Sequence, residues 1–259
     1  MRPASLTPVV LLAVFVAGCH QESNPVTPSP PGMASPTIAN LVIAGVDAVL
    51  TGSASHYSVT ATMSDGTTRS VTATWSSSNT EVASVDSAGR LDGRTHGQTT
   101  LTATVDAISA TKAVQVVNNY RGTWTGRYIV NVCDAPASTC VAMEYDVFSF
   151  PITLEVSQTG TDQNEISAML VLPSFLQIRA LLSGRVTSDG RLNLAGSSDL
   201  RRSGSVFATF HVGAWDTHLR GPDTMTGRWA QRLSNLQPPY DEYHEIELES
   251  MTRSGQRLR

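Results

Sequence analysis

The feature that most constrains the fold is a strict alternation of apolar and polar residues along the chain after residue 36. Tyr57, Val59, Ala61 and Met63 alternate with polar residues, and the turn Ser64-Asp65-Gly66 follows them. Almost no stretch of this region shows the 3.6-residue period of a helix. Alternation that is broken at short intervals by Gly-containing turns is typical of sandwiches and barrels. The sequence therefore predicts an all-β chain.

The first half of this region forms one predicted unit. Val71, Ala73 and Trp75 share one face of a return strand, with threonines on the other face. A strand around residues 100–105 alternates Thr with apolar residues, and residues 114–116 close the unit. Trp75 has two interpretations, a ligand-stacking residue or a core residue. Its parity with Val71 and Ala73 favours the core, where tryptophan commonly fills a sandwich.

A longer pattern in this unit resembles a known family. WSSSNTEVASVDSAGRLDGRTHGQTTLTAT, at residues 75–104, is similar to the bacterial immunoglobulin-like (BIG) group 2 family, and the similarity extends from about Pro36 to Val117. The resemblance implies an immunoglobulin-like β-sandwich without a core disulfide, and no cysteine occurs between Cys19 and Cys133. It also implies a non-catalytic spacer, adhesion or carbohydrate-contacting module on a cell surface. Architecture follows from such a resemblance more firmly than function does.

The second half of the region, from Tyr120, predicts a further β-domain. Its first strand places Trp124, Tyr128, Val130 and Val132 on one face. The other predicted strands span residues 148–156, 165–172, 177–186, 191–196, 206–212, 224–232 and 243–250. Eight antiparallel strands are enough for a meander to close on itself. We expect a β-barrel-like domain, with a second sandwich as the alternative and a short helix at 173–182 also open.

Two short motifs bear on this barrel. Gly122-x-Trp124 resembles the opening of lipocalin-like barrels. Thr-Gly-Arg precedes an aromatic residue twice, and we expect Arg127 and Arg228 of these repeats to lie over or beside a barrel end. The fold class is thus an immunoglobulin-like β-sandwich followed by an antiparallel meander β-barrel-like domain.

The amino terminus reads as an export signal that ends at Cys19. Arg2 precedes a short apolar run from Val9 to Ala17, which is too short to span a bilayer. Val16-Ala17-Gly18-Cys19 resembles the lipobox of bacterial lipoproteins, so lipidation of Cys19 is expected, with an ordinary secretory peptide as the alternative. Residue 20 is His and not the Asp that favours inner-membrane retention in such lipoproteins, which points to the outer membrane.

The segment after Cys19 is rich in proline. This segment cannot bury enough apolar surface to fold, and its prolines keep it extended. It is therefore expected to act as a spacer. The predicted organisation is a signal peptide at 1–18, a tether at 19–36, an Ig-like domain at 37–118, a barrel-like domain at 119–253 and a tail at 254–259. The expected location is the cell envelope, anchored to the outer membrane and either periplasmic or surface-exposed.

The two remaining cysteines, Cys133 and Cys140, bracket a Pro-containing loop. In an oxidising compartment such a pair predicts a disulfide bond. No histidine lies near either cysteine, which argues against a zinc site, and the spacing is not that of a Cys-x-x-Cys redox motif.

A search for catalytic chemistry finds little. His56, His96, His211, His218 and His244 are dispersed, although His211, Asp216, His218 and Asp223 lie close enough in sequence to converge at one hairpin end. Tyr243, Glu245, Glu247 and Glu249 share one face of the last strand, opposite Ile246 and Leu248. This row of carboxylates has three interpretations: a calcium site, a catalytic acid–base pair, or the solvent-exposed face of an antiparallel strand. The third is favoured. We expect no catalytic residues, no cofactor and no metal.

The whole sequence favours an exported interaction protein with no enzymatic activity. The formal charge is −4, and the basic residues form no stripe, so no nucleic-acid partner is expected. The expected partners are the membrane, through the lipid anchor, and a glycan or protein of the cell surface. Two alternatives stay open, a carrier of a small apolar ligand inside the barrel and a hydrolase of envelope polymer. An interior cavity would favour the carrier, and a filled barrel the interaction protein.

Overall fold

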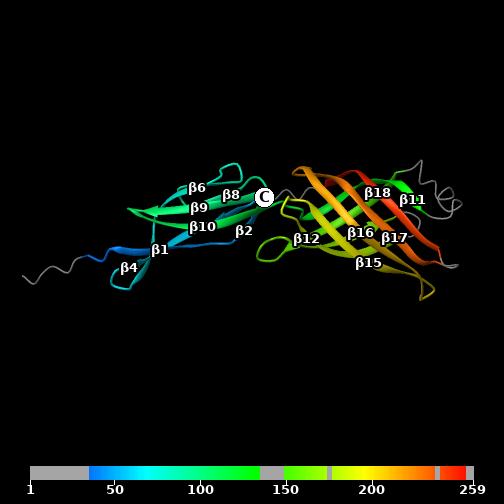
Figure 1. The fold of residues 1–259 in the computed structure, drawn as a ribbon, viewed down its shortest axis with the longest axis horizontal. Helices are drawn as coiled ribbons and strands as arrows, with labels where there is room; N and C mark the ends of the chain where they lie inside the picture. Colours follow the sequence, from blue (N-terminus) through cyan, green and yellow to red (C-terminus); the bar gives the residue numbers. More distant parts are fainter. Residues whose placement is uncertain (1–34, 135–148, 174–176, 237–239, 255–259) are drawn as a thin grey trace, which may run out of the picture. The chain divides into compact units, whose positions relative to one another are not determined.

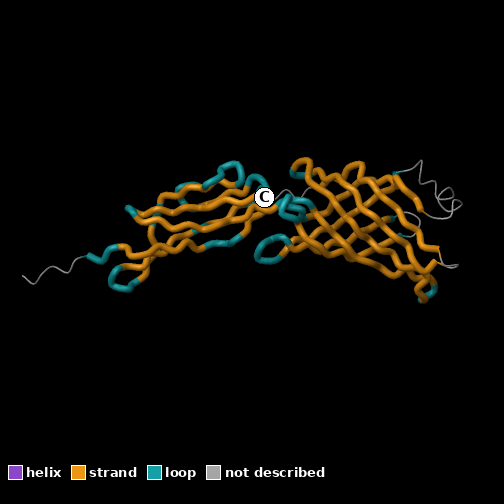
Figure 2. Tube along the Cα trace, in the orientation of Figure 1, coloured by secondary structure: helices purple, strands orange, loops and turns teal. Residues whose placement is uncertain are grey.

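The structure is a computed structural model that describes residues 35–134, 149–173, 177–236 and 240–254. In these ranges every regular element is a β-strand, as Figure 2 shows. The all-β prediction is therefore confirmed. The described residues also contain no helix that is long and apolar enough to cross a bilayer.

The N-terminal module consists of ten strands in three small sheets (Figure 1). The first sheet joins β1 (Ile38–Ala44), β4 (Ser58–Met63) and β5 (Thr68–Val71). The second joins β2 (Ala48–Leu50), β10 (Ile108–Val117), β9 (Gly97–Val105) and β6 (Thr74–Ser77). The third joins β3 (Ala54–His56), β8 (Arg90–Gly93) and β7 (Ala83–Val85).

The apolar face predicted for β4 forms part of the core of this module. Tyr57, Val59, Ala61 and Met63 are all buried, and Trp75 is partly buried and packs against the same cluster. The predicted return strand through Val71 and Trp75 is instead two strands. β5 pairs with β4, whereas β6 pairs with β9 in another sheet. The chain changes sheets between them, which a two-residue period cannot reveal because both strands keep the same parity.

The C-terminal domain is a closed barrel of eight antiparallel strands (Figure 1). In order they are β11 (Gly122–Asp134), β12 (Phe150–Thr159), β13 (Glu165–Leu172), β14 (Ile178–Val186), β15 (Leu192–Arg202), β16 (Ser205–Gly221), β17 (Thr224–Leu236) and β18 (Tyr240–Arg253). β18 pairs with β11 and closes the ring. The barrel prediction is thus confirmed, and the helix alternative at 173–182 is wrong for the residues from Ile178 onward.

The interior of the barrel is filled by large side chains. Those with under 2% of their surface exposed include Trp124, Trp215, Phe210, Leu154, Leu170 and Leu182. The rings of Trp215 and Trp229 stack at 4.8 Å between centroids, and Tyr128 meets Trp229 edge-on at 5.2 Å. An eight-stranded barrel is just wide enough for side chains to fill it. Trp124, Tyr128 and Val130 lie inside the barrel, as the alternation of residues in its first strand predicts.

Val132 departs from that prediction, because it is 42% exposed. The pairing of β11 with β18 shifts register between Val130 and Val132. A register shift of this kind reverses which side of the wall the following residues face. The register shift therefore keeps Val132 out of the core, and the alternation of apolar and polar residues in the sequence does not reveal such a shift.

One barrel end is closed around Trp124. Its indole N–H donates to the carbonyl of Tyr120 at 2.8 Å, and the Arg253 guanidinium lies 4.6 Å from its ring. The cation that covers this end is thus Arg253 of β18. Of the two Thr-Gly-Arg repeats, Arg127 donates to Ser149, which directly precedes β12, whereas Arg228 lies on the outer wall of β17 and does not cover a barrel end.

Candidate binding groove on the barrel wall

A bulge in β16 reshapes the outer wall of the barrel. β16 shifts register against both neighbours, between Gly213 and Asp216 on the β17 side. Ala214, inside the bulge, has a φ of 48°, an unusual value for a residue with a side chain. Phe210 and Val212, before the bulge, are buried, and so is Trp215 within it, three residues after Val212 instead of two. The bulge leaves a stretch of β16 unpaired with β15 and hollows the wall beside it.

Two hollows result on the outer wall. The first has a volume of about 540 Å³ and extends over β16, β17 and β18 to Asn131 of β11. The second, of about 760 Å³, lies over β14, β15 and β16. They share Arg191, Ala214, Asp216 and Arg228, so they form one continuous surface, which we call the wall groove. Each hollow by itself falls in the size range of ligand sites in proteins.

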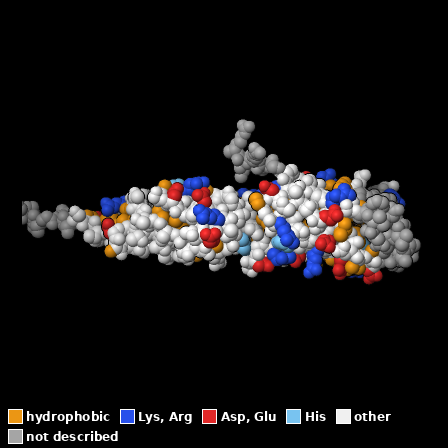
Figure 3. Space-filling view, turned by 90° about the horizontal axis from the view of Figure 1, so that it is seen from above, with side chains coloured by type: hydrophobic (Ala, Val, Ile, Leu, Met, Phe, Trp, Pro, Cys, Tyr) orange, Lys and Arg blue, Asp and Glu red, His pale blue; other side chains and the backbone are white. Residues whose placement is uncertain are grey.

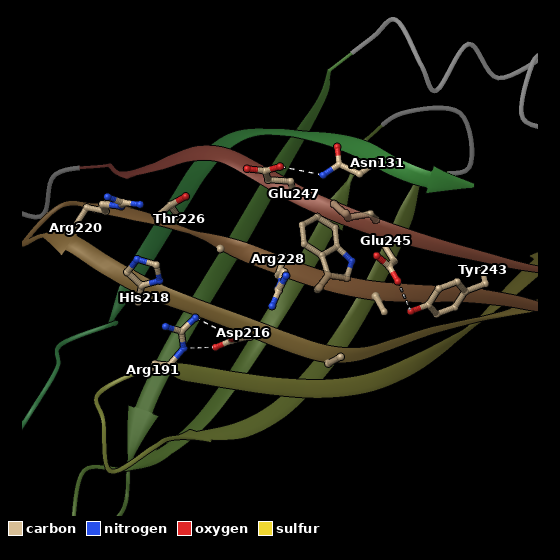
Figure 4. A pocket seen from close by; sticks show the side chains of 15 residues that line it. Asn131, Arg191, Asp216, His218, Arg220, Thr226, Arg228, Tyr243, Glu245 and Glu247 are labelled. Carbon is tan, nitrogen blue, oxygen red and sulfur yellow. Dashed lines mark hydrogen bonds and ion pairs between the residues drawn. The ribbon is translucent and has the colours of Figure 1, made fainter. Parts of the chain in front are cut away.

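An ion pair lies in the shared part of the wall groove. Arg191 donates from Nε to Asp216 Oδ1 and from Nη2 to Oδ2, the latter at 2.7 Å, in a bidentate arrangement. This hydrogen bonding raises the pKa of Arg191 above its ordinary value. A bidentate pair fixes the planes of both groups. The pair therefore gives the groove a rigid polar floor (Figure 4).

The groove is lined along β17 by side chains of two kinds. Arg228 is exposed on the outer wall, whereas the side chain of Trp229 is 2% exposed and packs in the barrel interior against Trp215. In Figure 4, Arg228 lies between the Arg191–Asp216 pair and Glu247.

The opposite rim supplies acceptors. Glu247 accepts a hydrogen bond from Asn131 Nδ2 at 2.9 Å, and Tyr243 donates to Glu245 at 3.5 Å. Tyr243 is 39% exposed, which leaves much of its ring open to solvent. The groove thus combines oriented carboxylates, basic side chains and an exposed aromatic ring. Acidic and basic side chains are also interspersed on the face drawn in Figure 3.

A separate polar cluster lies inside the barrel. Glu242 and His244 face inward from β18 and are 6% and 0% exposed, and Gln231 Nε2 lies 3.2 Å from His244 Nδ1. Burial lowers the pKa of His244 to about 4 and raises that of Glu242. Sequence reasoning missed Glu242, although its parity with Ile246 and Leu248 is a signal that was there to be found. Burial thus disfavours the charged form of both groups.

The other candidate residues separate into several places. Asp216 and His218 lie in the wall groove, whereas His211 contacts Ser234 and Asp223 pairs with Arg253 at 3.5 Å, so the four do not converge. Glu245, Glu247 and Glu249 are exposed on the outer face, as predicted. In the described ranges no three His, Cys, Asp or Glu residues are placed to hold a metal ion.

The predicted covalent sites depend on residues outside the described ranges. Cys19 lies there, and so does Cys140, whereas Cys133 lies in β11. Lipidation of Cys19 and the Cys133–Cys140 disulfide therefore stay predictions.

Comparison with known proteins bears on the N-terminal module. Residues 44–116 match the model of the bacterial Ig-like domain (group 2). The chain carries a bacterial Ig-like domain. This confirms the resemblance read from the Trp75 segment, and it favours a non-catalytic module of the cell surface or envelope. A search of curated proteins finds no match.

Two solved structures of a surface-layer protein are similar at a low level. The structure of domains 5-6 of the S-layer protein SbsC is 15% identical, and the match covers 82% of this chain and 97% of that chain at a TM-score of 0.29. The structure of its domains 4-9 is 13% identical, with 82% and 31% covered and a TM-score of 0.30. At these TM-scores the likeness supports no inference for this chain.

Proposed function

We propose that this protein is a lipid-anchored protein of the bacterial cell envelope that binds an envelope component without transforming it. In this proposal Cys19 carries the lipid, the Pro-rich segment is a tether, and the Ig-like domain presents the barrel. Two acyl chains or more make such anchoring stable. The wall groove is the binding site. The expected partner is a glycan or a protein of the cell surface.

The observation that carries the proposal is the pairing of a filled barrel interior with a polar groove on its outer wall. Trp215, Trp229 and Phe210 occupy the interior space in which a carrier would hold an apolar ligand. The groove, by contrast, is lined by polar and charged side chains of the outer wall, among them Arg228, Glu245 and Tyr243. A binding protein that works from its outer surface accounts for both features.

A hydrolase of envelope polymer has one observation in its favour, because Glu245 and Glu247 both line the groove. A general acid, however, must hold its proton near neutral pH, and burial against apolar groups is the usual means. Both glutamates are exposed. We therefore expect no new reducing ends when the protein is incubated with envelope polysaccharide, and their steady release would favour the hydrolase.

Fatty-acid labelling tests the anchor. Cells that express the full chain should incorporate labelled fatty acid into it, and Cys19→Ala should abolish incorporation. Equal labelling of the two proteins would contradict the anchor.

Sedimentation tests the binding site. The full-length protein in mild detergent should sediment with insoluble envelope fragments. Arg228→Ala, in the groove, should weaken this binding several-fold, whereas Arg179→Ala, an exposed arginine of β14 outside the groove, should not. Equal binding by the two variants would remove the groove from the proposal.

A further inference from the structure

We infer that the barrel wall can open between β15 and β16, and that the Arg191–Asp216 ion pair is the latch that holds it closed. Such a movement is a property of the fold and does not depend on the proposed function. It gives the barrel a conformational switch that responds to ionic strength. The wall groove lies over the place where the wall opens, so the shape of the groove depends on the latch.

The ladder between β15 and β16 is interrupted in its middle. It pairs Leu192 with Thr217, and the next pair is Gly196 with Val212. Between these pairs both strands lack ladder partners over the stretches that we call the seam, residues 193–195 and 213–216. The other register shifts in the described part of the barrel skip no more than two residues on either strand. A sheet opens most easily where its backbone is unpaired.

The β16 side of the seam is also strained and loosely packed. Ala214 has a φ of 48°, in the left-handed region, which a residue with a Cβ adopts only at a cost in conformational energy. A Cβ on its neighbour Gly213 would meet no atom within 4 Å, so the described chain leaves open space beside the strand at that point. Opening of the seam would therefore relieve strain at little loss of packing on the outer wall.

The latch crosses one end of the seam. Arg191 directly precedes β15, and its guanidinium donates two hydrogen bonds to the Asp216 carboxylate of β16 (Figure 4). In the described residues one further side-chain hydrogen bond joins the two strands, from Thr209 to Asp199 at 3.3 Å, and it lies beyond the far end of the seam. Both latch side chains are 36% exposed, so water and dissolved ions reach them. A bidentate pair of this kind holds two strands together, and salt weakens it.

The apolar core begins directly behind the seam. Leu194 and Trp215 line the hollow over β14, β15 and β16, although they are only 3% and 1% exposed. Trp215 is anchored in the core, because its indole N–H donates to Thr217 at 3.0 Å and its ring stacks on Trp229. Opening would therefore move β15 away from an anchored β16 and uncover Leu194 and Trp215 to water.

Hydrogen exchange of the full chain in mild detergent, followed by mass spectrometry of its peptides, tests the opening. Peptides that cover the seam should exchange at least about tenfold faster than those from residues 153–159 and 165–171, which pair without a break. In 1 M sodium chloride the Debye length is about 3 Å, so exchange at the seam should rise by about three- to tenfold. Exchange in the unbroken β12–β13 ladder should not respond to salt.

Variants locate the latch. Asp216→Asn removes the ion pair at almost constant side-chain size, so it should speed exchange at the seam about three- to tenfold and abolish the response to salt. It should also increase acrylamide quenching of tryptophan fluorescence, because Trp215 is uncovered. Asp199→Asn is the matched control, since it removes an exposed ion pair with Arg201 within β15 and keeps an acceptor for Thr209. It should exchange like the original chain.

Three results would overturn the inference. Exchange at the seam as slow as in the β12–β13 ladder would show that the wall does not open there. Unchanged exchange in Asp216→Asn, or in the original chain with added salt, would show that the ion pair is not the latch. A uniform rise over the whole barrel in Asp216→Asn would show that the pair supports general stability and not a local opening. These measurements use no ligand, so none of their outcomes bears on the proposed function.

Discussion

Trp124 fills the core at one end of the barrel. It is fully buried, donates to Tyr120 and lies under the Arg253 guanidinium. Trp124→Ala should lower the free energy of unfolding by about 3 to 5 kcal/mol, because it removes a large buried side chain and leaves a cavity. Urea unfolding of the full chain measures the change.

Val132→Ala is the matched control on the same strand. Val132 is 42% exposed, so its truncation should change the free energy of unfolding by no more than about 0.5 kcal/mol. Similar losses for the two variants would show that Trp124 contributes no more to the barrel than an exposed residue does.

His244 makes the stability of the barrel depend on pH. Burial lowers its pKa from 6.5 to about 4, so between these values the unfolded chain binds a proton that the folded chain does not. Stability is then lost as the pH falls from about 6.5 to 4, by about 3 kcal/mol. Glu242 acts in the opposite sense, because its raised pKa makes the folded chain less stable as the pH rises above 4.5.

Unfolding measurements at two pH values show how much of this pH dependence comes from His244. The free energy of unfolding of the original chain and of His244→Gln is measured in urea at pH 7 and pH 4.5. The loss on acidification should be smaller in His244→Gln, which cannot take up the proton. If both proteins lose the same free energy, His244 is not the titrating group.

At the scale of elements, the barrel wall depends on close approach of strands. Gly184 of β14 has no room for a side chain, since a Cβ there would lie 1.9 Å from the carbonyl oxygen of Asn193 on β15. Gly184→Ala should therefore force the two strands apart and destabilise the barrel by about 1 to 3 kcal/mol. Thermal or urea unfolding gives the change.

Gly213, at the β16 bulge, is the corresponding control. A Cβ there would meet no atom within 4 Å, and its φ is not in the left-handed region. Gly213→Ala should leave the unfolding midpoint nearly unchanged. If the unfolding midpoint shifted equally in Gly184→Ala and Gly213→Ala, the close approach of β14 and β15 at Gly184 would not explain the loss of stability.

At the scale of the whole molecule, the closed barrel should fold without the Ig-like domain. Its strands pair in one ring from β11 to β18, and its core residues Trp124, Trp215 and Trp229 all come from the barrel. A fragment of residues 118–259 should unfold cooperatively in urea, with coincident transitions in circular dichroism and tryptophan fluorescence. A gradual, non-cooperative transition would show that the barrel needs the preceding domain.

The local pattern of the sequence was enough to predict the eight barrel strands and the inward face of Trp124, Tyr128 and Val130, because side-chain alternation and turn residues act over a few positions. The Ig-like module was instead predicted from the resemblance of the Trp75 segment to a known family. The exposure of Val132, the split of the 71–75 strand, the position of Arg253 over Trp124 and the wall groove were decided by the tertiary structure. Each depends on a bulge or on the pairing of strands distant in the chain, and alternation carries no information about either.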